Sequence, residues 1–90
     1  MKNNGGFIMK ETKILKLNNL SIGLAAKIHK ISATGKLKRK LLDMGLSKGA
    51  KIIVKGKAPM GDPLEVKVRG YNLTLRKEEA KKIEVKGAKI

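Results

Sequence analysis

Apolar residues in this chain occur in short stretches, where they alternate with lysine or another polar residue, and glycine or proline separates these stretches. Alternation places successive side chains on opposite faces of a strand, so the pattern predicts a half-buried sheet. Phe7 and Tyr71 are the only aromatic residues, which leaves Leu, Ile, Val, Ala and Met to build the core. A 90-residue chain of this kind can enclose one core if its sheet curls on itself.

The pattern predicts five short strands, of which the first covers residues 24–31. Ile28 and Ile31 lie three positions apart and cannot share one face of a regular strand, so we expect a bulge there. The next strand is expected at 50–55, and the last contains Ile83 and Val85.

The third and fourth strands form a predicted hairpin. A two-residue turn at 70–71, with glycine first, pairs Val68 with Leu73 and Val66 with Leu75. All four apolar side chains then lie on one face, and a slip of one residue would break this arrangement.

One helix is expected over residues 35–44, with Thr34 as its N-terminal cap and an apolar stripe along one side. Gly45 suits the left-handed position that follows a helix, and Leu46 can then contact Leu41 in a Schellman motif.

A shaped loop is expected at residues 58–63. Pro59 fits the second position of a type I turn and Gly61 the fourth, while Pro63 favours an extended Asp62.

These elements predict a mainly β fold with one inserted helix, a small SH3-like barrel over residues 14–86. Residues 1–13 are expected to form a flexible N-terminal tail and residues 87–90 a C-terminal tail. The side chains assigned to the core are Leu41, Val54, Val66, Val68 and Leu75.

The charge of the chain is strongly positive: 22 Lys and Arg against 7 Asp and Glu give a formal net charge of +15. This favours an anionic partner or neighbourhood. The absence of cysteine excludes disulfides and thiolate metal sites, and no apolar run resembles a signal peptide or a membrane span. We expect a cytoplasmic protein that can also lie at the inner face of the cell membrane.

Residues with catalytic potential are scarce. The single histidine, His29, stands beside two lysines and is expected to be a partly exposed surface residue. The chain contains no phosphate-binding glycine motif and no metal-ligand spacing. We therefore expect no catalytic residue, no cofactor and no metal ligand in this chain.

The basic face of the predicted helix can bind phosphates. Nucleic-acid modules of this barrel class usually add stacking aromatics, and Tyr71 alone at a hairpin tip is a poor platform. We therefore expect only non-specific binding of nucleic acid, while anionic lipid and an acidic protein surface both remain compatible with the charge.

The order of several residues and motifs along this chain resembles the FeoA family, which consists of small cytoplasmic proteins of bacterial ferrous-iron uptake. The two most specific pieces are the Asp-Met-Gly-Leu helix exit at 43–46 and the Ala-Pro-x-Gly-Asp-Pro loop at 58–63. The remaining matches, between residues 15 and 85, are Leu17, Leu20, Gly23, Ile28, Ile31, Leu41, Leu42, Gly49, Leu73, Thr74, Leu75, Arg76, Ala80, Ile83 and Val85.

The resemblance implies a non-enzymatic accessory protein that docks to the cytoplasmic GTPase region of the Fe(II) transporter FeoB. It suggests a docking surface formed by the helix exit and the loop, with basic residues that meet acidic groups of the partner. These residues are Arg39, Lys40, Met44, Gly45, Leu46, Pro59, Gly61, Asp62, Pro63 and Arg76. Turn chemistry alone also explains the glycines and the loop.

Two other interpretations remain open. A small basic barrel could bind RNA or the ribosome, and the domain also resembles the C-terminal domain of metalloregulators of the diphtheria-toxin-repressor type. The chain has no DNA-binding helix-turn-helix before its barrel, so it would be a free-standing version of that domain.

Overall fold

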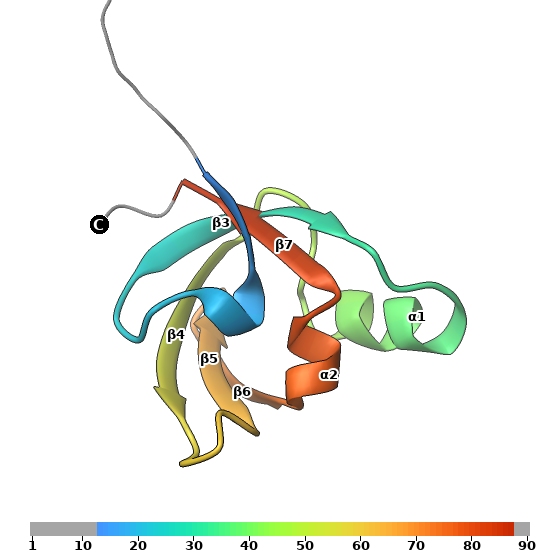
Figure 1. Cartoon of the computed structure of the whole chain (residues 1–90). Coiled ribbons are helices and arrows are strands. Elements are labelled where there is room, and N and C mark those ends of the chain that lie inside the picture. Colours follow the sequence, from blue (N-terminus) through green and yellow to red (C-terminus); the bar gives the residue numbers. More distant parts are fainter. Residues whose placement is uncertain (1–12, 88–90) are drawn as a thin grey trace, which may run out of the picture.

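The structure is a computed structural model, which describes residues 13–87. Six strands and three short helical segments follow one another along this part of the chain (Figure 1). They are β2 (Ile14–Lys16), the 3-10 helix η1 (Leu17–Asn19), β3 (Ala25–Ile31), α1 (Gly35–Asp43), β4 (Lys51–Lys57), β5 (Leu64–Val68), β6 (Tyr71–Leu75), α2 (Lys77–Ala80) and β7 (Ile83–Lys86). Apart from Lys13 and Gly87, both predicted tails lie outside the described residues.

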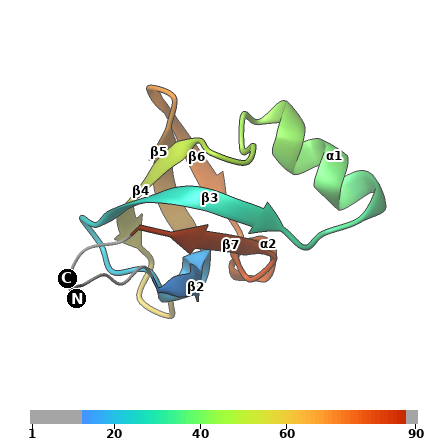
Figure 2. The ribbon, with the colours of Figure 1, turned by 90° about the horizontal axis from the view of Figure 1, so that it is seen from above.

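The strands form one antiparallel sheet in the order β2-β7-β3-β4-β5-β6, and the fold is mainly β and SH3-like. Figure 2 shows the sheet curling, so that β5 and β6 cross behind β3 and β7, while α1 stands at one end. The prediction of five strands missed β2, which pairs with β7. Three residues are too few for alternation to reveal a strand, and only the partner strand stabilises it.

The predicted bulge in β3 is confirmed. Ile28 pairs with Val85 and Lys30 pairs with Glu84, so His29 is the extra residue between two consecutive residues of β7. The bulge allows Ile31 to face the core side although it lies three positions after Ile28.

The predicted hairpin register is wrong, because the turn lies one residue earlier. Val66 pairs with Leu73, and Leu64 pairs with Leu75, in a register that buries both leucines of the second pair completely. Arg69 and Gly70 have φ angles of 52° and 84°, which suit a tight turn that matches the strand twist. The change of register by two residues keeps each apolar side chain on its predicted face.

The exit of α1 confirms the predicted Schellman motif. The N–H of Leu46 donates to the carbonyl of Leu41 at 3.1 Å, and Gly45 has a φ of +93°. At the other end Thr34 is the N-cap residue, as predicted, but the expected hydrogen bond from its side chain is absent. Gly35 begins the helix at a φ of +60°, so the first turn does not present its N–H groups to Thr34 in the usual geometry.

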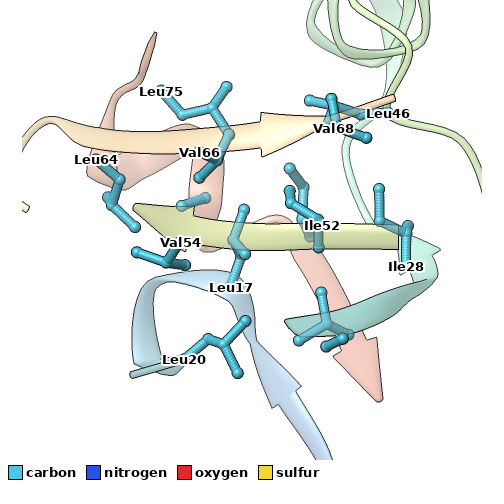
Figure 3. Close-up of a cluster of buried hydrophobic side chains, with 14 of the residues drawn as sticks. Leu17, Leu20, Ile28, Leu46, Ile52, Val54, Leu64, Val66, Val68 and Leu75 are labelled. Carbon is cyan, nitrogen blue, oxygen red and sulfur yellow. The ribbon is translucent and has the colours of Figure 1, made fainter. Parts of the chain in front are cut away.

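The core lies between the curled strands, and side chains from opposite walls meet there (Figure 3). All five residues that the sequence assigned to the core are buried. Leu17 and Leu20 enter it from η1 and from the residue that follows, next to β7 and α2. Burial of these apolar side chains is the main stabilising contribution in a chain that lacks tryptophan and cysteine.

Candidate docking site

Four of the predicted docking residues lie together around one depression of about 480 Å³. Lys40 comes from α1, Asp62 and Pro63 from the loop before β5, and Arg76 from the junction of β6 and α2. Figure 1 shows α2 between α1 and the strands, which is how this short helix brings the distant segments together. Thr74 and Glu79 complete the lining. We call these six residues the α1–α2 depression.

An ion pair joins the two helices at this depression. The Lys40 Nζ atom lies 2.7 Å from Glu79 Oε2, and the two side chains are 58% and 14% exposed. Glu79 Oε1 accepts a hydrogen bond from the backbone N–H of Arg76 at 2.9 Å. The hydrogen bond from Lys40 lowers the pKa of Glu79, burial opposes this change, and the bond from Arg76 lowers the pKa further.

The loop is attached to the same helix through Asp62. Its Oδ1 atom accepts a hydrogen bond from the backbone N–H of Lys77 at 3.0 Å, which satisfies a free donor in the first turn of α2. Inside the loop, Gly61 N–H donates to the Ala58 carbonyl at 2.6 Å, as the predicted turn requires. Asp62 therefore joins the loop to α2, 15 positions further along the chain.

The two cations of the depression differ in availability. Lys40 is paired with Glu79, whereas Arg76 forms no ion pair within residues 13–87, although its charge is near enough to help lower the pKa of Glu79. Arg76 is also exposed. Its guanidinium offers five donors in a fixed plane, an arrangement that suits a carboxylate of another molecule.

Arg69, which was not among the predicted docking residues, holds the end of α1 through two hydrogen bonds. Arg69 Nη2 donates to Ser47 Oγ at 2.9 Å, and Arg69 Nε donates to the Gly45 carbonyl at 3.3 Å. Its positive φ is uncommon for a residue with a side chain. No local sequence signal indicates this role, because the contact depends on how the hairpin lies against α1.

Leu46 was predicted to lie on the docking surface, but the structure places it in the core. Its side chain is completely buried and belongs to the core, so it cannot contact a partner (Figure 3). The Schellman motif is the physical reason, since it directs the second residue after the helix inward. Met44 and Gly45 are half-buried beside it.

The remaining predicted residues lie on the surface but do not line the depression. Arg39 and Pro59 are exposed, and Gly61 is half-buried at the loop turn. The sequence analysis missed Met60, whose side chain is 84% exposed at the tip of this loop. The sequence signal available was a methionine that stands between Pro59 and Pro63 in the predicted loop, because an apolar side chain on a shaped loop is typical of a contact surface.

The described residues contain no cluster suited to metal binding. Between residues 13 and 87, no three His, Cys, Asp or Glu side chains come together to hold a metal ion. His29 is half-buried, and its Nδ1 atom has no hydrogen-bond partner among these residues. Over the same part of the chain, no helix is long and apolar enough to cross a membrane.

The FeoA domain model matches residues 15–87, which is most of the chain. The chain belongs to the FeoA family. A fusion of Fe(2+) transport protein A and the Fe(2+) transporter FeoB from Porphyromonas gingivalis is 37% identical over 71 residues, which are 79% of this chain and 8% of that protein. The chain therefore spans only a small part of this relative.

Solved FeoA structures have the same fold. The FeoA-like protein from Clostridium acetobutylicum is 42% identical with a TM-score of 0.76, over 87% of this chain and 90% of that one. The zinc complex of Stenotrophomonas maltophilia FeoA, described as a procaryotic SH3 domain protein, is 29% identical with a TM-score of 0.70, over 79% and 88%. A manganese-dependent transcriptional repressor, 19% identical over 84% of this chain and 37% of the repressor, shares the fold alone with a TM-score of 0.77.

Proposed function

We propose that this FeoA protein is a non-enzymatic accessory factor of ferrous-iron uptake that docks to the cytoplasmic GTPase region of a FeoB transporter and supports or regulates transport. The observation that carries the proposal is the Porphyromonas gingivalis relative, in which a FeoA part and FeoB form one polypeptide. Fusion keeps two parts at a high effective concentration, which is useful when they act on each other.

The α1–α2 depression and the adjacent loop tip are the surface we assign to docking. Arg76 offers an exposed guanidinium, and Met60 offers an exposed flexible apolar side chain on the loop that carries Asp62. Arginine and methionine are enriched at protein interfaces. Asp62 and Glu79 hold this surface in shape through their bonds to α2 and Lys40.

The test is binding of the purified chain to the cytoplasmic GTPase region of its transporter at physiological salt, by calorimetry. The variant Met60→Ser/Arg76→Gln removes two exposed side chains from the assigned surface and should weaken binding at least tenfold, the usual effect of losing important interface residues. Tyr71→Ser/Lys36→Gln is the matched control, because it also removes one exposed large side chain and one cation.

Unchanged affinity of the control and weakened affinity of the site variant would support this assignment. Equal affinities for both variants would refute the assigned surface. A wild-type chain that does not bind the GTPase region with or without nucleotide would refute docking itself.

A further inference from the structure

Three lysines face one another across three adjacent strands. The register pairs Lys27 of β3 with Lys51 of β4 on one side and with Lys86 of β7 on the other. All three side chains are exposed. Their sequence neighbours Ala26, Ile28, Ile52 and Val85 are buried, so the lysines point away from the core. We call these three residues the lysine row.

An apolar floor accompanies the lysine row. A cavity of about 560 Å³ is lined by the row together with Leu24, Ala25, Ala26 and Gly87. Beyond the row, Ile14 pairs with Lys86 and is 51% exposed on the same face. The result is a surface of exposed or half-exposed aliphatic groups bordered by ammonium groups.

No carboxylate neutralises the lysine row within the described part of the chain. The two ion pairs found there are Lys40–Glu79 and Lys81–Glu78, which lie elsewhere. The closest carboxylate along β7 is Glu84, which lies opposite Lys16 and Lys30 in the strand register and accepts a hydrogen bond from the Ser32 hydroxyl at 3.3 Å. Like charges directly opposite in a sheet destabilise it, so the row weakens the isolated fold and favours an external anion.

We propose that this face binds the surface of an anionic membrane, with the lysine row on lipid phosphates and the aliphatic floor against the glycerol and acyl boundary. Lysine places its aliphatic stem along apolar material while its ammonium stays at the phosphate level. A nucleic acid would not use the exposed isoleucine and would lack aromatic stacking on this face. The face lies at the end of β7 and the start of β3, opposite α1 (Figure 2), so it leaves the α1–α2 depression free.

The experiment measures co-sedimentation of the full chain with vesicles of phosphatidylcholine alone or with about one third phosphatidylglycerol. Each lysine near an anionic membrane contributes about fivefold to binding, so Lys27→Gln/Lys51→Gln/Lys86→Gln should lower the partition coefficient about 100-fold. The control Lys36→Gln/Lys48→Gln/Lys82→Gln removes the same charge from exposed positions outside the row and should change it less than tenfold.

Two further measurements separate the membrane from other ligands and from misfolding. Ile14→Ser should lower vesicle binding without any change in charge, and the triple row variant should unfold at the same temperature as the wild type or a higher one. Equal losses in both triple variants, binding to phosphatidylcholine alone that matches the mixed vesicles, or displacement by millimolar glycerol phosphate would overturn the proposal. The assay contains no transporter, so its result is independent of docking to FeoB.

Discussion

Replacement of Glu79 by glutamine isolates the charge that joins α1 to α2. The substitution keeps an acceptor for the Arg76 N–H but removes the ionic bond to Lys40, whose nitrogen lies 2.7 Å from the carboxylate. Glu79 is mostly buried while Lys40 is largely exposed, so we expect the upper part of the range for partly solvated pairs, about 1 kcal/mol. For a domain of this size that corresponds to a fall of about 4–8 °C in melting temperature.

The effect has a defined pH dependence. The pKa of Glu79 is lowered in the folded protein by Lys40, so the folded state favours the ionised form more than the unfolded state does. The stabilisation is therefore complete above the unfolded pKa and is lost as the pH falls through the lower folded pKa. The wild type should lose its advantage over Glu79→Gln in acid and keep it at pH 7.

Thermal unfolding followed by circular dichroism at pH 7 and in acid tests this, with Glu78→Gln as the matched control. Glu78 is 81% exposed and its carboxylate is 3.9 Å from Lys81, so its loss should cost less than about 0.5 kcal/mol. Equal melting temperatures of the two variants at pH 7 would refute the reasoning. So would a difference between wild type and Glu79→Gln that stays the same in acid.

Three further predictions concern the helix exit and the loop, all by chemical denaturation. Gly45→Ala should destabilise by about 1–2 kcal/mol, because a side chain at a φ of +93° is strained, whereas Gly56→Ala, with no positive φ, should cost less than about 0.5 kcal/mol; equal losses would contradict this. Leu46→Ala should cost about 3 kcal/mol as a core cavity, and a loss under about 1 kcal/mol would show that Leu46 is not core. Asp62→Ala should cost about 1 kcal/mol by removing the acceptor for α2, and a neutral result would exclude that role.

These predictions divide the sequence motifs of the family into two physical roles. Gly45, Leu46 and Asp62 hold the backbone and core in place, so a loss of transport in their variants would report on folding as much as on docking. Met60 and Arg76 are exposed, so their variants should report on docking without a change in stability.

Local rules were sufficient for much of the fold. The alternation of apolar and polar residues predicted β3 to β7, and the Gly45-Leu46 pair predicted the Schellman motif at the end of α1. Both signals depend on residues only a few positions apart. The hairpin turn was misplaced by one residue, since two registers keep the same faces apolar and burial of Leu64 against Leu75 decides between them.

The sequence by itself determined five of the six strands, the inserted helix, much of the core and the excess of positive charge. Tertiary structure alone decided which charges are neutralised and which remain available. Lys40 meets Glu79 across 39 positions, while Lys27 faces Lys51 and Lys86 with no carboxylate between them. The reason is that these partners are set by strand register and by the curl of the sheet, which depend on the packing of the whole chain.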